Sequence, residues 1–273
     1  MVTLDSLLPL LSQPPVVLGL DAYGVIYNDE GFFESMPALF EYCNDQRIPI
    51  YMVTNNATQS IPDIKAKMDA NQLHLPAERI ISSGCGCYLM PDVRAMIDSK
   101  RVFVYGYPSS FYYAKTAGGL LVDDPADAEV IVFAASQWKN NHHMYKAVFD
   151  AFKANPNLPG ICINPDHYVR NGAGLMSVMG YYTHQMALQL NRSDWIWMGK
   201  PFQRFSELVR LVLNRDGHDP SSLIFCDDNP HNVLQLTHDL SCQGVVIRDT
   251  GVANRYPVQN ADHLYQMPIC KLK

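Results

Sequence analysis

The sequence predicts an α/β fold in which helices cover a doubly wound parallel sheet. Two observations lead to this prediction. Apolar, strand-like runs alternate with segments of helical periodicity, and several of the apolar runs end directly in a polar or charged residue. The 273 residues are 48% hydrophobic and 18% charged, which is typical of a globular chain long enough for one large domain or two modest ones.

The first part of the chain supplies strands and helices in strict alternation. Pro15 to Leu20 is an apolar run that we expect to form a buried strand, and Ser60 precedes a helix as an N-cap residue. The predicted elements are a strand over 15–20, a helix over 37–45, a strand over 48–54, a helix over 60–71 and a short strand over 80–81.

The pattern changes at Ser82-Ser83-Gly84, and a second set of elements follows. Its predicted strands cover 101–105, 120–122, 129–133 and 160–163, and its first helix covers 142–152. A second helical face is predicted from apolar residues that recur at helical spacing, namely Leu175, Val178, Met179, Tyr182 and Met186.

After about residue 191 the first pattern resumes. We expect strands over 195–198, 223–226 and 244–247, with helices over 202–213 and 232–240. The economical interpretation is a core domain made of residues 1–82 and 193–273, interrupted by an inserted α/β domain over 83–192.

Composition and charge exclude several classes of function. The net charge of −6 and the absence of a dense Lys/Arg cluster argue against nucleic acid as a partner. No apolar run reaches the ~20 residues of a membrane span, and the start lacks a positively charged leader. Seven cysteines without a zinc spacing indicate reduced thiols. We therefore expect a cytoplasmic protein that binds neither membrane nor nucleic acid.

Four separated segments share the feature that carries chemistry. Each has a polar residue at the carboxyl end of an apolar strand, which gives Asp21, Thr54, Lys200 and the pair Asp227-Asp228. Such strand ends meet at one crevice in a doubly wound sheet. Two carboxylates, a hydroxyl and a lysine suit phosphoryl chemistry, since one carboxylate can attack phosphorus, another can hold Mg²⁺, and the hydroxyl and ammonium can neutralise phosphoryl oxygens.

The order of these segments resembles the four motifs of the haloacid dehalogenase superfamily. Asp21 matches the nucleophile, Thr54 the hydroxyl of motif II, Lys200 the lysine of motif III and Asp227 the first acid of motif IV. The resemblance is closest to the class IIA, NagD-type branch, whose cap is inserted between motifs II and III. Supporting runs are Thr54-Asn55-Asn56, Ser82-Ser83-Gly84, Asn164-Pro165-Asp166 and Gly199-Lys200-Pro201.

The resemblance implies a Rossmann-like core with an α/β cap and a Mg²⁺-dependent phosphatase. An aspartyl phosphate on Asp21 would be the intermediate, and a small phosphorylated metabolite the substrate. Mg²⁺ would be held by Asp21, by the main-chain carbonyl of Tyr23 and by Asp227, with Asp228 nearby. Phosphate and substrate would be bound by Thr54, Asn55, Asn56, Lys200, Asn164 and Asp166.

Two residues depart from the family pattern. Tyr23 stands where the superfamily has a second Asp that serves as general acid and base, and Asn232 stands where motif IV usually ends in Asp. A phenol, with an ordinary pKa near ~10, is a poor base at neutral pH. Because general acid–base help contributes typically ~10²–10⁴-fold, we expect a slow enzyme. Asp228 could supply through water the charge that Asn232 lacks.

Other interpretations stay open at this point. The protein could be an impaired relative that binds a phosphorylated ligand or a partner protein, or it could transfer the phosphoryl group to an acceptor other than water. Tyr23 could simply pack its ring over the site entrance, and Asn164-Pro165-Asp166 could be a plain turn. The cap aromatics could stack on a substrate ring or form a homodimer interface, and they are Tyr112, Tyr113, Trp138 and Tyr168.

Overall fold

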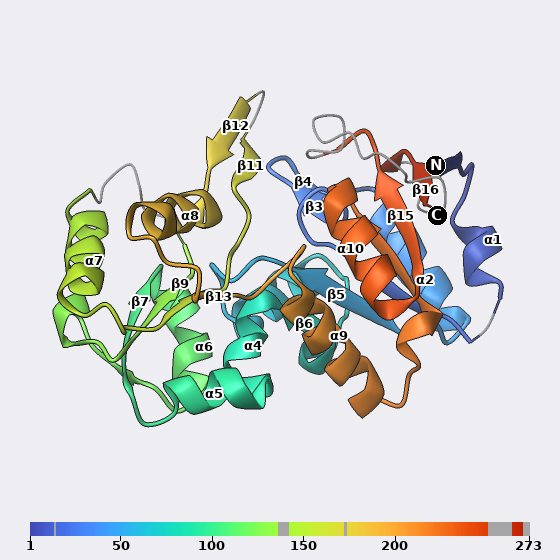
Figure 1. Ribbon diagram of the computed structural model, residues 1–273. Helices are drawn as coiled ribbons and strands as arrows, with labels where there is room; N and C mark the ends of the chain where they lie inside the picture. The colour runs from blue at the N-terminus through green and yellow to red at the C-terminus, as the bar shows by residue number, and fades with distance from the viewer. Residues whose placement is uncertain (14, 136–141, 172–173, 251–263, 270–273) are drawn as a thin grey trace.

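A seven-stranded parallel sheet forms one of the two lobes in a computed structural model of the protein (Figure 1). The structure describes every residue except 14, 136–141, 172–173, 251–263 and 270–273. The strand order is β1, β16, β15, β14, β2, β5, β6, and every neighbouring pair is parallel. The strands are β1 (Val2–Thr3), β2 (Val17–Leu20), β5 (Ile50–Thr54), β6 (Ile80–Ser82), β14 (Leu223–Asp227), β15 (Gln243–Ile247) and β16 (Tyr265–Met267).

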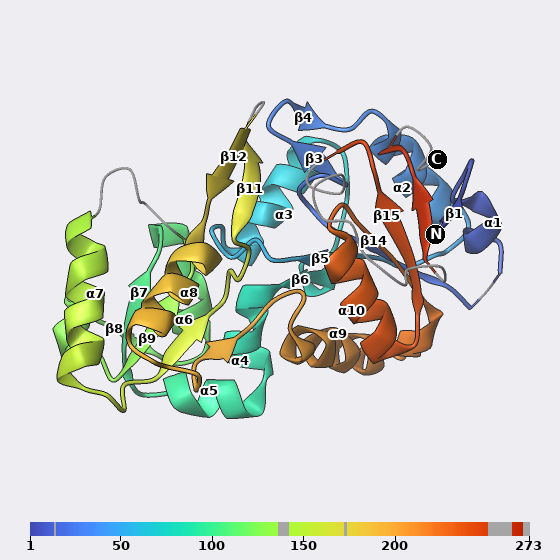
Figure 2. The same ribbon diagram turned by 45° about the horizontal axis from the view of Figure 1, so that its top comes forward.

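Helices cover this sheet on both faces, as the alternating pattern predicts. Figure 2 shows α2 (Ser35–Asp45) and α3 (Ile61–Ala70) on one face, with α9 (Gln203–Arg215) and α10 (Pro230–Leu240) on the other. A short helix, α1 (Leu8–Leu11), lies near the chain start. The predicted N-cap of α3 is confirmed, since the Ser60 side chain accepts the backbone N–H of Asp63 at 3.2 Å. The predicted α/β core with a parallel sheet is therefore confirmed.

The second lobe contains its own parallel sheet, in the order β13, β10, β9, β7, β8. Phe133 at its centre stacks on Phe152 and packs against Trp195, with ring centroids 6.0 and 5.3 Å apart. The strands are β7 (Arg101–Tyr105), β8 (Leu120–Leu121), β9 (Val130–Phe133), β10 (Gly160–Cys162) and β13 (Ile196–Trp197). The helices are α4 (Gly86–Leu89), α5 (Pro91–Ile97), α6 (Phe111–Thr116), α7 (His142–Ala154) and α8 (Met179–Gln189).

Two antiparallel hairpins stand outside both sheets, and they lie side by side in both views (Figures 1 and 2). One is β3 (Tyr27–Asn28) with β4 (Gly31–Phe32), directly after β2. The other is β11 (Tyr168–Asn171) with β12 (Gly174–Ser177), which rises from the second lobe. These hairpins bring segments far apart in the sequence to the space between the lobes.

Two sequence predictions are wrong in this region. The expected helical face begins too early, because Leu175 lies in β12 and is 37% exposed, whereas α8 starts only at Met179. The apolar run 195–198, assigned above to the resumed core, forms β13, which pairs with β10 of the second sheet. The second sheet therefore extends to residue 197, beyond the proposed limit at residue 192.

The cysteines and the lengths of the helices complete the description of the fold. Six cysteines are free thiols, and Cys270 lies outside the described residues. In the part of the chain that the structure describes, no helix has the length and apolar character needed to cross a membrane.

Candidate functional site at the carboxyl ends of the parallel strands

Three predicted site residues lie at the ends of adjacent strands. Asp21 directly follows β2, while Thr54 and Asp227 are the last residues of β5 and β14, the two strands that flank β2. All three strands are parallel, so their carboxyl ends meet at one edge of the sheet. Strands β5 and β14 lie on opposite sides of β2, which makes this edge a topological switch point, where open α/β sheets bind ligands.

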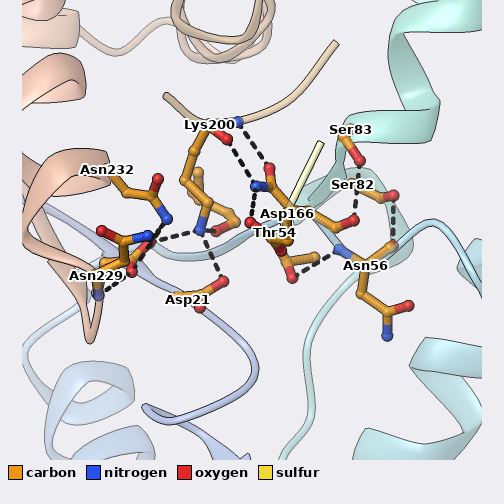
Figure 3. A network of polar contacts seen from close by, with 12 residues as sticks. Asp21, Thr54, Asn56, Ser82, Ser83, Asp166, Lys200, Asn229 and Asn232 are labelled. Atoms are coloured by element: carbon orange, nitrogen blue, oxygen red, sulfur yellow. Dashed lines mark hydrogen bonds and ion pairs between the residues drawn. The ribbon is translucent and has the colours of Figure 1, made fainter. Parts of the chain in front are cut away.

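The ammonium of Lys200 lies at the centre of this cluster (Figure 3). Its Nζ donates to Asp21 Oδ1, to Asp227 Oδ2 and to the backbone oxygen of Val53, each at 2.7 Å. Lys200 is only 2% exposed. Burial alone would lower the pKa of this ammonium, but the two carboxylates outweigh burial and raise it. Lys200 is therefore held as a cation with all three of its protons bonded.

Asp227 is fully buried below the pocket floor and receives two further donors. The backbone N–H of Asn229 donates to its Oδ1 at 2.7 Å, and Asn232 Nδ2 lies 3.4 and 3.3 Å from its two oxygens. Burial raises the pKa of Asp227 to about 7, against the opposing effect of Lys200. The ionised form of Asp227 thus depends on the cation and donors around it.

A cluster of three buried carboxylates fits a hard divalent cation. Ligand oxygens of Asp21, Asp227 and Asp228 all lie within 4.8 Å of one another. Asp228 reaches this place because Gly24 has a φ of +89° and no side chain, since a Cβ there would come within 2.8 Å of Asp228 Cγ. The buried Oδ1 of Asn232 has no hydrogen-bond partner among the described residues. Carboxylate and amide oxygens are the ligands that Mg²⁺ and Ca²⁺ prefer.

Asn55 joins motif III to the end of β5. Its Oδ1 accepts the backbone N–H of Lys200 at 2.7 Å, and its Nδ2 donates to the Lys200 carbonyl at 2.8 Å. The same Nδ2 donates to Asp166 Oδ1 at 2.8 Å. The sequence analysis names Asn55 only as a residue that binds phosphate or substrate, and this link over 145 residues was missed.

Asp166 is the carboxylate that the second lobe contributes to the site. Burial raises its pKa to about 6, while the Asn55 hydrogen bond and the Lys200 cation oppose that rise. Its main chain packs tightly against the start of α8. The approach is so close that a Cβ on Gly180 would lie 2.6 Å from the Asp166 carbonyl oxygen. The run Asn164-Pro165-Asp166 is thus a turn and also a wall of the pocket.

The serines singled out between the two lobes brace the loops that form the site. Ser82 Oγ donates to the carbonyl of Asn56 at 2.7 Å. Ser83 Oγ donates to the carbonyls of Asn55 and Ile163, and so links the end of β5 to the strand end before Asn164. Tyr113 donates to Ser82 at 3.0 Å and is fully buried. Tyr113 therefore cannot be the exposed cap aromatic that the sequence analysis considered.

Tyr23 occupies the motif I turn, and its hydroxyl contacts the second lobe. Its Oη donates to the backbone carbonyl of Arg170 in β11 at 2.8 Å. Its ring meets Tyr27 edge-on, with centroids 6.4 Å apart. Burial and the Asp29 carboxylate raise the pKa of the Tyr23 phenol well above its ordinary value. At neutral pH this phenol is a hydrogen-bond donor and no base.

A cavity of about 320 Å³ opens above these residues, between the lobes. Asp227 is fully buried and is the one predicted site residue that does not line the cavity, while Asn232 lines it as well. The nine predicted residues that line it are Asp21, Tyr23, Thr54, Asn55, Asn56, Asn164, Asp166, Lys200 and Asp228. Sequence reasoning missed Tyr27, Tyr107, Arg170 and Asn229 as lining residues. Of these four residues, only Asn229 could have been predicted from the sequence, because it lies inside motif IV. Tertiary packing alone brings the other three to the cavity.

The remaining cap aromatics lie in different surroundings. Tyr168 lines the cavity and is 37% exposed. Tyr112 is partly buried and packs on Tyr88 and Tyr113, with ring centroids 6.3 and 5.5 Å apart. Trp138 lies outside the described residues. Tyr168 is thus the one member of this set that the described structure places at the pocket.

Comparison with known proteins agrees with the motifs. A family model described as haloacid dehalogenase-like hydrolase matches residues 18–119. A dihydroxyacetone phosphatase from Corynebacterium glutamicum (strain R) is 21% identical over 244 residues, which cover 87% of this chain and 84% of that protein.

Solved structures of similar fold extend over most of the chain. A p-nitrophenyl phosphatase from Archaeoglobus fulgidus superposes with a TM-score of 0.72 at 19% identity, covering 85% of this chain and 87% of its own. NagD from E. coli K-12 gives a TM-score of 0.72 at 14% identity, covering 94% and 98%.

These solved structures show that the parallel α/β core and the second lobe together have the fold of NagD and of the p-nitrophenyl phosphatase. Within residues 18–119, which include Asp21 and Thr54, the chain is similar to the haloacid dehalogenase-like hydrolases. The NagD-type fold predicted from the motifs is confirmed, the family match extends over residues 18–119, and the roles of single site residues stay predictions.

Proposed function

We propose that the protein is a Mg²⁺-dependent phosphatase of small phosphorylated metabolites that forms an aspartyl phosphate on Asp21. The observation that carries the proposal is the Asp21 carboxylate, which lines the cavity while Lys200 holds one of its oxygens at 2.7 Å. The phosphatase names of the relatives support the same reaction class. Residues 83–192, together with β13, would form the cap that selects the substrate.

In the proposed first step, a carboxylate oxygen of Asp21 attacks phosphorus, and the bond from phosphorus to the leaving-group oxygen breaks. Lys200 would hold Asp21 in place and draw off part of the developing charge. The Thr54 Oγ1 accepts the backbone N–H of Asn56 at 3.1 Å, which leaves its own proton to donate to a phosphoryl oxygen. The leaving group takes its proton from water or from a nearby acid.

In the second step, water attacks the aspartyl phosphate, which releases phosphate and restores the Asp21 carboxylate. Asp21, Asp227, Asp228 and the main-chain carbonyl of Tyr23 would hold Mg²⁺, which supplies charge neutralisation at the phosphoryl group when bound. No carboxylate stands at position 23 to remove a proton from the water. We therefore expect the second step to be slow and to limit turnover.

A second candidate is a binding protein for a phosphorylated ligand on the same scaffold. The observation that favours it is the hydrogen bond from Tyr23 Oη to the Arg170 carbonyl, since the phenol is already committed to the second lobe. Such a protein would bind phosphate esters at the same cavity and hydrolyse none.

Hydrolysis of an aryl phosphate separates the two candidates. The wild-type protein is compared, with and without Mg²⁺, with Asp21→Asn and Tyr23→Asp. Mg²⁺-dependent release that disappears in Asp21→Asn supports the phosphatase. No release by the wild type, with release by Tyr23→Asp, supports the binding protein. Equal release by the wild type and Asp21→Asn contradicts the proposed mechanism.

A further inference from the structure

The hairpin formed by β11 and β12 is anchored to its own lobe mainly at its base. There the Val178 N–H donates to the carbonyl of His167 and the Gly180 N–H donates to the carbonyl of Asp166, both at 3.0 Å. Among the described residues, the sheet pairing of these two strands is with each other, Arg170 opposite Leu175. A two-stranded hairpin is marginally stable in water by itself. A contact from the other lobe further along the strands therefore helps to set where the hairpin lies.

Tyr23 makes such a contact from the other lobe. Its Oη donates to the Arg170 carbonyl at 2.8 Å, across 147 residues of sequence. The Tyr23 ring meets Tyr27 edge-on, and Tyr23 directly precedes the turn in which the Gly24 N–H donates to the Tyr27 carbonyl at 2.7 Å. The motif I turn thus helps to set the position of the hairpin relative to the first lobe.

The hairpin also forms one wall of the cavity. Tyr168, Val169 and Arg170 from β11 and Met176 from β12 all line it, together with the polar residues Asp21, Thr54 and Lys200. Any displacement of β11 away from Tyr23 would therefore widen the cavity.

We propose that Tyr23 is a positioning residue, which holds the β11–β12 hairpin over the cavity through the Arg170 carbonyl and so limits the size of the group esterified to phosphate. Position 23 then selects compact phosphate esters instead of transferring a proton. The selectivity rests on the proposed phosphatase function, whereas the positioning of the hairpin does not.

Amide hydrogen exchange tests the positioning without any substrate. Tyr23→Phe keeps the ring and removes the donor, and Tyr51→Phe is a matched control that removes a hydroxyl bonded to Asp216 at 2.7 Å. One hydrogen bond corresponds to about a 2- to 10-fold change in an opening equilibrium. We expect exchange in 168–171 and 174–177 to rise by about that factor in Tyr23→Phe and to stay unchanged in Tyr51→Phe. Unchanged exchange in Tyr23→Phe would overturn the proposal.

Kinetics with two esters tests the selectivity. Methyl phosphate and a naphthyl phosphate are compared by kcat/KM in the wild type, Tyr23→Phe and Tyr51→Phe. A relative gain for the bulky ester in Tyr23→Phe, mainly through KM and with the same pH profile, supports the proposal. A general fall in kcat with a changed pH profile would overturn it, since that is the signature of a lost acid. Absence of turnover in all three proteins, with faster exchange in Tyr23→Phe, would remove the phosphatase and leave the positioning role intact.

Discussion

Lys200 Nζ lies 2.7 Å from Asp21 Oδ1, although 179 residues separate the two side chains in the sequence. Lys200 is 2% exposed, so water solvates its ammonium very little. The charge is stabilised by the protein groups around it. Removing one partner of a buried ion pair leaves the other charged group without compensation, which typically costs about 3–5 kcal/mol. This relationship therefore couples the stability of the core to the chemistry of the site.

Lys200→Met should lower the free energy of unfolding by about 3–5 kcal/mol, because Asp21 and Asp227 lose their shared cation. Urea denaturation measures this loss. Mg²⁺ should restore part of the stability in the variant and add less to the wild type. Lys65→Met, which removes the exposed partner of Asp69, is the control and should change stability by less than about 1 kcal/mol. A loss no larger than that of Lys65→Met would contradict the buried-pair interpretation.

Asp21→Asn should abolish turnover and leave the fold intact. An amide cannot attack phosphorus, so we expect a fall of at least about 10⁴-fold in kcat, as for other lost nucleophiles. Asp92→Asn is a suitable control, since Asp92 pairs with Arg204 on the surface at 2.6 Å. Steady-state rates with an aryl phosphate, together with circular dichroism, check both points. Full activity in Asp21→Asn would rule out the aspartyl phosphate.

The part of the site that lies on β2, β5 and β14 could be predicted from the sequence for a simple physical reason. Each apolar run ends in a polar residue, and parallel strands bring their carboxyl ends to one edge. Asp21, Thr54 and Asp227 follow from this rule without knowledge of any long-range contact. The strand-end rule does not account for Lys200, because the strand before it, β13, belongs to the second sheet. Lys200 could be predicted from its motif alone.

The rest of the site depends on packing that a local pattern does not encode. Leu175 and Met176 fit helical spacing and strand alternation equally well over a short run, and the structure places both in an exposed hairpin strand. Nothing near Arg170 in the sequence indicates that its carbonyl meets Tyr23. Likewise, the Asn55 side chain can accept the backbone N–H of Lys200 only because the fold brings Lys200 close to the end of β5.

The proposed Mg²⁺ site leads to opposite predictions for two substitutions in motif IV. Asp228→Asn should weaken Mg²⁺ binding by about 10-fold or more, since a carboxylate is lost from the three-acid cluster. Asn232→Asp should strengthen it, because a charge is added beside Asp227. Calorimetric Mg²⁺ titration measures both, with Asp69→Asn as a surface control. Equal affinity in Asp228→Asn and the wild type would place Asp228 outside the metal site.

Asp166 should make the protein less stable as pH rises. Its folded-state pKa is raised from 3.8 to about 6, so the native state binds the proton more tightly than the unfolded chain does. Its stabilising contribution is then complete below pH ~4 and is lost between about pH 4 and pH 6, by on the order of 3 kcal/mol.

The variant Asp166→Asn retains an oxygen that can accept from Asn55 Nδ2 and cannot titrate. Urea denaturation from pH 4 to 7 should give a wild-type curve that falls relative to that of Asp166→Asn through this window. Parallel curves would show that Asp166 does not titrate there.

Tyr23→Asp should raise the rate of the second step by about 10²–10⁴-fold, because a carboxylate at this position can accept a proton from the attacking water. The same change removes the donor to the Arg170 carbonyl, so hairpin exchange should rise as it does in Tyr23→Phe. Rapid-quench measurement of the phosphoenzyme separates the two effects. Faster decay of the aspartyl phosphate in Tyr23→Asp but not in Tyr23→Phe isolates proton transfer from hairpin position. Equal decay rates in both variants would mean that Tyr23 slows hydrolysis of the aspartyl phosphate only through its hydrogen bond to the hairpin.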